Sequence, residues 1–263
     1  MFLWNPRRNR PVSAIILIAW IAVTGAGCGQ TPPDYAAQYQ ALIGSCNIND
    51  NQRGSFMAPD DSAPIQVIED SDFSSAEQTS ISAAVDEWNR YGTSVKRGTL
   101  FTTTVGAIPS DIKTATTLSC DQTDWGDPSS FHLVRITDPA QWKSLGFSSS
   151  VPAATLRCYS DGALTQQVII FRPDLVDATQ ITTVILHELG HSLGLEHSCA
   201  SVSQSSPNWA SCSGLTSSDP YYQAVMYPSI QLGNTGTGSA PQTKNQLSQN
   251  DEDRANCYYK AGQ

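Results

Sequence analysis

The chain is poor in basic residues and in histidine. Its 263 residues include 15 lysines and arginines against 24 aspartates and glutamates, for a formal net charge of −9, and only four histidines. An acidic chain does not attract a phosphate backbone, so the composition argues against nucleic acid as a partner. None of the seven cysteines belongs to a CxxC pair, which disfavours a cysteine-ligated zinc site. Three of the four histidines nevertheless fall within one run, HELGHSLGLEH, and this run is the most informative feature of the chain.

The spacing within this run is that of a catalytic zinc site. His187 and His191 are four residues apart, so on a helix they project from one face and can share a metal. A catalytic zinc takes three protein ligands and one open position for water, and Gly194 can turn the chain back so that His197 becomes the third ligand. Glu188 would be the general base that takes a proton from the water as it attacks a carbonyl polarised by the zinc. The residues predict peptide-bond hydrolysis; the alternative is a helix whose histidines only form hydrogen bonds or face solvent.

The extended pattern resembles the metzincin zinc endopeptidases, whose HExxHxxGxxH signature continues to a methionine-containing turn beneath the metal. Met226 supplies such a methionine. The sequence Met226-Tyr227-Pro228, together with Ser198 directly after the third histidine, is similar to the matrixin branch, the matrix-metalloproteinase type. The resemblance implies a bacterial enzyme with an α/β (α+β) metzincin-like zincin fold. In such a fold a twisted mixed sheet packs on the active-site helix and a second helix, and a smaller C-terminal subdomain follows the third histidine.

The hydrophobic pattern agrees with an α/β layer. A strand at residues 65–68 precedes a helix that opens with a capping box, Ser74 to Glu77, and runs to about residue 91. Further strands are expected at residues 99–105, 131–137, 153–159 and 167–171, and the active-site helix at residues 178–193. The resemblance implies that the strand at residues 153–159 is an edge strand facing the cleft, where an extended peptide can add a strand. An edge strand without a ligand is the alternative.

The N-terminus has the pattern of an export signal. Three arginines precede an apolar run at residues 12–23, which is shorter than the roughly 20 residues of a membrane helix, and small residues lead to Cys28. We expect a signal peptide at residues 1–27, a tether at residues 28–54 and the catalytic domain at residues 55–263. Cys28 resembles the lipid-modified cysteine of bacterial lipoproteins, which implies a membrane anchor at the outer membrane or cell surface; simple secretion and a retained apolar anchor are the alternatives.

The cysteine count supports export. With Cys28 set aside, six cysteines remain, an even number that suits three disulfides in an oxidising compartment. Cys199 with Cys212 is the favoured pair because it closes a short loop beside the active site. The remaining four cysteines stay open, and one assignment joins Cys120 to Cys158 and Cys46 to Cys257.

A calcium site is a further expectation. Matrixins often carry calcium, and the loop CDQTDWGDP has spaced carboxylates at Asp121, Asp124 and Asp127. The EF-hand spacing is absent, so a solvated turn is the alternative reading of this loop.

Together these observations predict an exported zinc endopeptidase that acts on a protein or peptide substrate. One catalytic Zn2+ is held by His187, His191 and His197, and Glu188 is the catalytic residue. Two alternatives keep the same motif. One is a non-catalytic zinc-containing surface lipoprotein that binds peptides or a partner, which the intact glutamate argues against. The other is a zinc amidase acting on cell-wall peptides.

Overall fold

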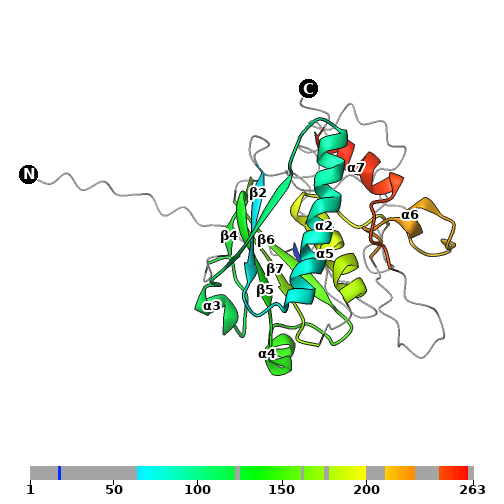
Figure 1. Ribbon diagram of the computed structural model, residues 1–263. Helices are drawn as coiled ribbons and strands as arrows, with labels where there is room; N and C mark the ends of the chain where they lie inside the picture. The colour runs from blue at the N-terminus through cyan, green and yellow to red at the C-terminus, as the bar shows by residue number, and fades with distance from the viewer. Residues whose placement is uncertain are drawn as a thin grey trace, which may run out of the picture.

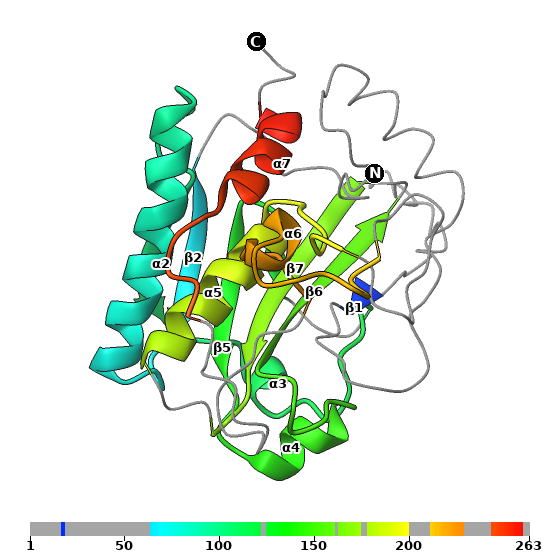
Figure 2. The same cartoon turned by 90° about the vertical axis from the view of Figure 1, so that its right-hand side faces the viewer.

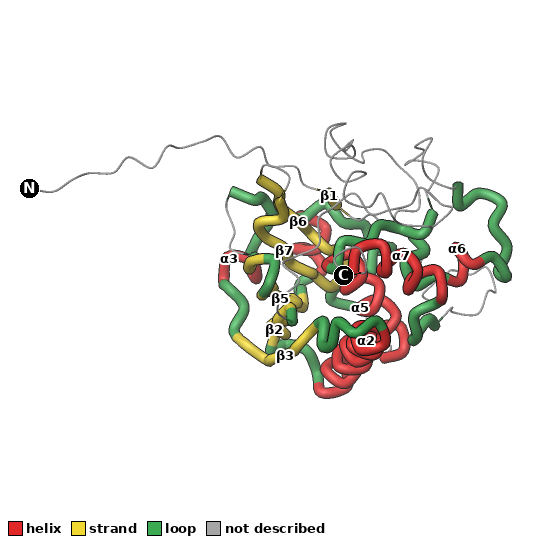
Figure 3. Tube along the Cα trace, turned by 90° about the horizontal axis from the view of Figure 1, so that it is seen from above, coloured by secondary structure: helices red, strands yellow, loops and turns green. Residues whose placement is uncertain are grey.

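The computed structural model describes residues 17–18, 64–121, 125–160, 163–174, 178–199, 211–228 and 243–259. In these residues a mixed sheet forms one layer and two long helices, α2 and α5, form a second layer along it (Figures 1 and 3). The strands are β1 (Leu17–Ile18), β2 (Ile65–Asp70), β3 (Phe101–Gly106), β4 (Gly126–Asp127), β5 (Ser130–Arg135), β6 (Ala153–Ser160) and β7 (Ala163–Phe171). The helices are α2 (Ser75–Ser94), α3 (Ser110–Lys113), α4 (Pro139–Ser144), α5 (Ala178–Ser192), α6 (Pro220–Gln223) and α7 (Gln249–Tyr259).

The strand order places β6 near one edge of the sheet, beside α5 (Figure 2). The order is β1-β6-β7-β5-β2-β3, and β4 pairs with β5 beside this path. Strands β3, β2, β5 and β7 run parallel, whereas β6 is antiparallel to β7. Only the two-residue β1 lies beyond β6 in the described part of the chain, with Leu17 opposite Arg157 and Ile18 opposite Leu156. The strand expected at residues 153–159 is present as β6, but it is next to the edge of the sheet and not at it, because β1 pairs with its outer side.

The helices and strands predicted from the sequence are present, with ends that differ by a few residues. The capping box of α2 is formed, because the Ser74 hydroxyl accepts the Glu77 amide at 3.3 Å and the Glu77 carboxylate accepts the Ser74 amide at 2.8 Å. β7 begins earlier than expected because its polar first half, Ala163 to Gln167, pairs with β6 in a hairpin. The short helices α3 and α4 were not expected, since neither is long enough to show a helical period.

The sheet buries apolar side chains on both faces. Along β5, Leu133 belongs to the core beneath α2 and α5, whereas its neighbour Val134 belongs to a second core that contains Trp142 of α4. The same alternation occurs in β7, where Ile169 and Ile170 belong to different cores. Successive side chains of a strand point to opposite faces, so covering both faces requires near-continuous apolar strands. This explains the consecutive apolar residues Leu133 and Val134 in β5 and the apolar run Val168 to Phe171 in β7.

None of the described helices combines the length and apolar character needed to cross a bilayer. The predicted signal peptide, apart from β1, and the predicted tether at residues 28–54 lie outside the described residues. Cys28 lies outside them as well, so its lipidation stays a prediction.

Candidate metal centre

Helix α5 carries the first half of the histidine motif inside the protein. His187, Glu188 and His191 are all fully buried. The helix is tied to α2 by Trp88, whose indole Nε1 donates to the Leu186 carbonyl at 2.9 Å. Buried polar groups need partners, because their loss of water is otherwise uncompensated. The contacts of these three side chains therefore show what the site is arranged to hold.

A tight turn ends α5 and returns the chain toward it. The Gly194 amide donates to the His191 carbonyl and the Leu195 amide donates to the Gly190 carbonyl, both at 2.9 Å, which is the hydrogen-bond pair of a Schellman motif. Gly194 has a φ of 92°, a left-handed conformation that glycine adopts without a Cβ clash. The turn predicted from the sequence at Gly194 is confirmed, and it places His197 back beside the helix.

The three imidazoles of the motif converge on one point. A ligand-type nitrogen from each of His187, His191 and His197 lies within 4.8 Å of the others. The ring centroids are 4.7, 5.3 and 5.0 Å apart. The Nε2 atoms of His187 and His191 are 3.1 Å apart, and two nitrogens bound to one tetrahedral zinc at 2.0 to 2.1 Å would be about 3.3 Å apart. The ring positions fit a shared metal ion.

The second nitrogen of each helical histidine fixes the tautomer that a metal requires. His187 Nδ1 lies 2.7 Å from the Val225 carbonyl, and His191 Nδ1 lies 2.7 Å from the Leu195 carbonyl. A carbonyl oxygen only accepts, so each Nδ1 carries the proton and each Nε2 presents a lone pair. Two lone pairs that face each other at 3.1 Å repel unless a cation lies between them. The donor set therefore fits a metal better than it fits a hydrogen-bonded pair, and carbonyl support of this kind is common for metal-binding histidines.

Burial also keeps these histidines in the neutral form that binds metals. Burial lowers the pKa of His187 to about 4. Burial lowers the pKa of His191 well below its ordinary value, and the neighbouring His187 and His197 lower it further. Loss of water disfavours the charged imidazolium, so both rings stay unprotonated at neutral pH. Neither has to release a proton before it binds a metal.

Glu188 lies on the same helix with one oxygen engaged and one available. Its Oε2 accepts a hydrogen bond from the Thr155 hydroxyl of β6 at 2.6 Å. Its Oε1 is buried and has no hydrogen-bond partner among the described residues. Burial raises the pKa of Glu188 to about 7, although the Thr155 hydrogen bond opposes the rise. A carboxyl group with a pKa close to neutral can both accept and release a proton, as a general base and acid must.

The methionine predicted to lie beneath the metal packs directly under α5. Met226 is fully buried, and a Cβ at Gly190 would lie 2.4 Å from its sulfur. Its carbonyl accepts the Ser198 amide at 2.7 Å, and the Asp251 carboxylate of α7 accepts the amides of Val225 and Met226 at 2.8 and 3.1 Å. The turn is therefore held from both sides, by the segment after the third histidine and by the last helix.

Several residues that contact the candidate metal centre were not predicted from the sequence. Thr155 and Arg157 of β6 both reach α5, and Arg254 of α7 reaches the carbonyls of Glu196 and His197 at 2.9 and 3.1 Å. An arginine in a mostly apolar strand was the one available signal, because charged residues are seldom buried without a partner. The partner of Arg157 is Glu196, which lies 39 residues further along the chain, and no spacing rule relates the two residues.

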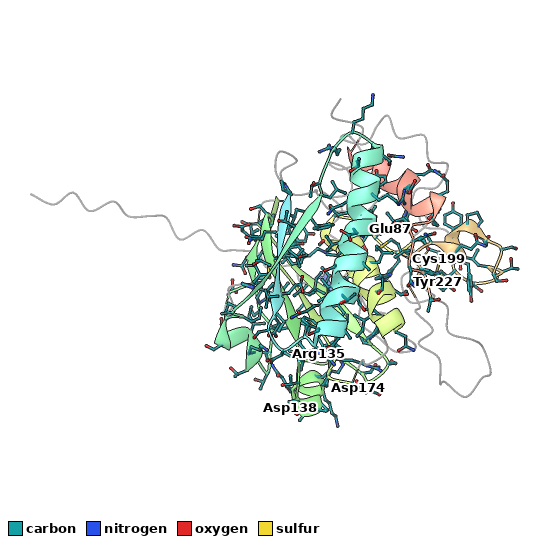
Figure 4. All side chains as sticks on the ribbon, viewed as in Figure 1. Glu87, Arg135, Asp138, Asp174, Cys199 and Tyr227 are labelled. Atoms are coloured by element: carbon teal, nitrogen blue, oxygen red, sulfur yellow. A yellow bond between two sulfur atoms is a disulfide. The ribbon has the colours of Figure 1, made fainter. Side chains whose placement is uncertain are left out.

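Two of the predicted disulfides are formed. Cys199 is bonded to Cys212, and Cys120 is bonded to Cys158 of β6. Cys199 lies on the side of α5 toward α6, where Tyr227 is also found (Figure 4). The third suggested pair, Cys46 with Cys257, lies outside the described side chains.

The loop that suggested calcium is described only in part, because Asp124 lies outside the described residues. The Asp127 carboxylate caps a local turn by accepting the amides of Ser129 and Ser130 at 2.8 Å. Asp121 is exposed. The turn accounts for Asp127, and calcium binding stays an untested prediction.

The fold and site define a metallopeptidase with a mixed α/β zincin fold, as the sequence predicted. Residues 68–240 match the model of metallo-peptidase family M12, of the reprolysin type. Because this match covers more than half of the chain, the protein belongs to that family. The solved structure of myroilysin is similar at 16% sequence identity and a TM-score of 0.37, with coverage of 78% of this chain and 96% of that chain. No curated protein matches the sequence. The metallopeptidase prediction is thus confirmed, and the match names family M12, not the matrixin branch.

Proposed function

We propose that the protein is a zinc-dependent endopeptidase in which His187, His191 and His197 hold one zinc ion and Glu188 moves the proton. The observation that carries the proposal is the pair of Nε2 lone pairs facing each other at 3.1 Å, next to a buried carboxylate with an uncommitted oxygen. When bound, the zinc ion would polarise the scissile carbonyl and lower the pKa of the attacking water. The borderline nitrogen donors of three imidazoles suit zinc better than calcium or magnesium, which prefer oxygen ligands.

The proton transfer falls to Glu188. Thr155 holds its Oε2 at 2.6 Å and so fixes the carboxylate, which leaves Oε1 to accept the proton of the attacking water. The same carboxyl group can then give this proton to the departing amine, because its pKa of about 7 allows both directions near neutral pH. Both steps use one residue, and a second acid is not required.

We propose that the substrate is an extended peptide that binds along β6. One edge of β6 pairs with β7, and its other edge pairs with β1 at Arg157 and Leu156. That pairing supports the proposal, since it shows an extended segment accepted antiparallel at this edge. A peptide added there would form main-chain hydrogen bonds that orient its scissile bond independently of most side chains. β1 itself lies within the predicted signal peptide, residues 1–27.

Ser198 and the sequence Met226-Tyr227-Pro228, which are similar to the matrixin branch, support a proposal about the substrate cleft. The Ser198 hydroxyl donates to the Tyr221 carbonyl at 2.6 Å, so the serine after the third histidine joins the α6 segment to the metal centre. Tyr227 and Pro228 follow the buried Met226 directly. We propose that residues 226–228 form a wall of the substrate cleft, as in the matrixin type. We also propose that the protein is bacterial, is exported and is anchored to the membrane through Cys28.

The test compares the purified protein with its Glu188→Gln variant. The wild type should bind one zinc ion per chain and cleave an unfolded protein, and a chelator should stop cleavage. Glu188→Gln should keep the zinc and the Thr155 contact but lose cleavage. Glu87→Gln is the matched control, because it neutralises another buried glutamate, on α2, and should leave cleavage in place.

Each alternative has its own outcome in this experiment. Zinc and peptide binding by a wild type that never cleaves would indicate a non-catalytic surface protein. Cleavage of cell-wall peptides but not of proteins would indicate an amidase. Full activity in Glu188→Gln would refute the assigned base.

A further inference from the structure

Two buried arginines converge on the short segment that joins the second and third histidines. Arg157 comes from β6 and Arg254 from α7, and both are 1% exposed. Arg157 donates through Nη1 to the His191 carbonyl at 3.0 Å and through Nη2 to the Glu196 carboxylate at 3.0 Å. Arg254 donates through Nη2 to the carbonyls of Glu196 and His197. Elements from three parts of the sequence thus meet behind the metal-binding rings.

These contacts act on the backbone that sets the ligand positions. The Leu195 carbonyl holds the ring of His191 at 2.7 Å, and Glu196 lies between Leu195 and His197. Glu196 therefore anchors, through its carboxylate and its carbonyl, the segment between the carbonyl that orients the second histidine and the third histidine itself. Arg157 holds this segment at two points, since it contacts both the end of α5 and Glu196.

The cost of burying these charges argues that they have a specific role. A buried ion pair loses its hydration, and an apolar pair of similar volume often stabilises a fold as well or better. Such pairs are best explained where they fix one geometry, because a guanidinium holds several acceptors in a rigid fork. Arg157 uses its fork in this way, with one nitrogen on each side of the turn at Gly194.

The position of Arg157 in β6 adds a second connection. Thr155 and Arg157 are two residues apart, so they point to the same face of the strand. Thr155 contacts Glu188 and Arg157 contacts His191 and Glu196. One face of the proposed substrate strand therefore touches the proton-transfer residue and the turn between two ligands.

We propose that Arg157, through Glu196, is a positioning residue that holds the turn after α5 so that His197 completes the metal-binding triad. This inference rests on the proposed zinc site. It predicts that loss of Arg157 weakens metal binding in addition to the fold, and mutations of residues that orient metal ligands typically cost about 10- to 100-fold in metal affinity.

The experiment uses the purified protein with Glu188→Gln as background, so that self-cleavage cannot disturb the measurements. The zinc dissociation constant is measured by competition with a chromogenic chelator, and the visible spectrum of the cobalt-substituted protein reports the ligand geometry. The melting temperature of the metal-free protein reports the fold separately. The variants are Arg157→Met, Arg157→Lys and Glu196→Gln.

Arg135→Met is the matched control. Arg135 forms a comparable, mostly buried ion pair with Glu77 at 3.1 Å and donates to the Pro173 carbonyl at 3.0 Å, and neither partner belongs to α5 or to the segment that carries His197. It should lower the melting temperature of the metal-free protein and leave the zinc dissociation constant and the cobalt spectrum unchanged.

Arg157→Met should raise the zinc dissociation constant by about 10- to 100-fold and alter the cobalt spectrum. Arg157→Lys, which keeps the charge but has no fork, and Glu196→Gln, which keeps an acceptor, should show smaller changes in the same direction. These milder variants decide the question if Arg157→Met does not fold. The inference would be overturned if Arg157→Lys and Glu196→Gln both had the zinc affinity and the cobalt spectrum of the background protein. Failure of the background protein itself to bind zinc would instead overturn the proposed function.

Discussion

The contact between Gly190 and Met226 gives a prediction whose sign depends on packing. Alanine normally stabilises a helix interior relative to glycine by about 1 kcal/mol. At this position, however, a Cβ would lie 2.4 Å from the Met226 sulfur and 3.2 Å from both Met226 Cε and Trp88 Cζ2. Overpacking of a filled core costs typically about 1–3 kcal/mol, so the clash outweighs the helix preference. We expect Gly190→Ala to lower the free energy of unfolding by up to about 2 kcal/mol, the upper clash cost less the helix gain.

The same substitution should behave differently when the methionine is truncated. Met226→Ala by itself costs roughly 2–5 kcal/mol, because it leaves a cavity in the core. In that background the two Met226 atoms nearest the added Cβ are gone and Trp88 Cζ2 remains at 3.2 Å, so Gly190→Ala should be close to neutral or stabilising. The interaction energy between the two sites should then be roughly 1–3 kcal/mol, within the range found for residues in contact.

Thermal unfolding of the metal-free protein is a suitable assay, in a Glu188→Gln background that prevents self-cleavage. A change of 1 kcal/mol shifts the melting temperature by about 2–4 °C for a domain of this size. Gly92→Ala in α2 is the control, because its Cβ would meet the Gly98 carbonyl oxygen at 2.4 Å and the Leu100 side chain, and none of its three nearest atoms belongs to Met226. It should be destabilising by the same amount in both backgrounds. An equal effect of Gly190→Ala with and without Met226 would refute the packing argument.

Two further predictions concern the disulfides and a buried lysine. From loop length alone, replacing Cys199 and Cys212 by serine should lower the free energy of unfolding by roughly 3 kcal/mol. Replacing Cys120 and Cys158 should lower it by roughly 4 kcal/mol, because that bridge closes the longer loop. A larger loss of melting temperature for the Cys199–Cys212 pair would contradict this order. Burial lowers the pKa of Lys244 to about 8, below its value in the unfolded chain. Between about pH 8 and 10.5 the unfolded state therefore binds more protons than the folded state. The contribution of Lys244 to the free energy of unfolding should rise with pH in this range. The melting temperature of the wild type should therefore gain on that of Lys244→Met from pH 8 to pH 10, and a constant difference would exclude the shift.

The candidate metal-binding residues could be predicted from the sequence because local geometry places them. His187, Glu188 and His191 share one helix, and Gly194 ends it with a turn only a few residues long. Each step uses a spacing rule that holds in any helix, whatever surrounds it. The strands could be found for a similar reason, since apolar runs that cover both faces of a sheet are visible in composition.

The surroundings of the site could not be found in the same way. Thr155 and Glu188 are 33 residues apart, and Arg157 and Glu196 are 39 apart. Their contacts exist only because β6 forms a hairpin with β7 and then lies beside α5. The polar first half of β7 concealed that hairpin, because residues such as Gln166 and Gln167 do not form an apolar period. Long-range contacts between polar groups depend on the whole topology, and the arginine in β6 was the one sign of them in the sequence.

The dual contact of β6 has a consequence for how the protein would respond to a peptide. Thr155 and Arg157 lie two residues apart on one face of β6. Any sliding or tilting of β6 when a peptide docks would carry Thr155 and Arg157 together, and with them the carboxylate and the ligand turn that they contact. Peptide binding and the position of Glu188 would thus both depend on β6. A peptide that fits β6 poorly would bind more weakly and would also leave the Glu188 carboxylate out of position.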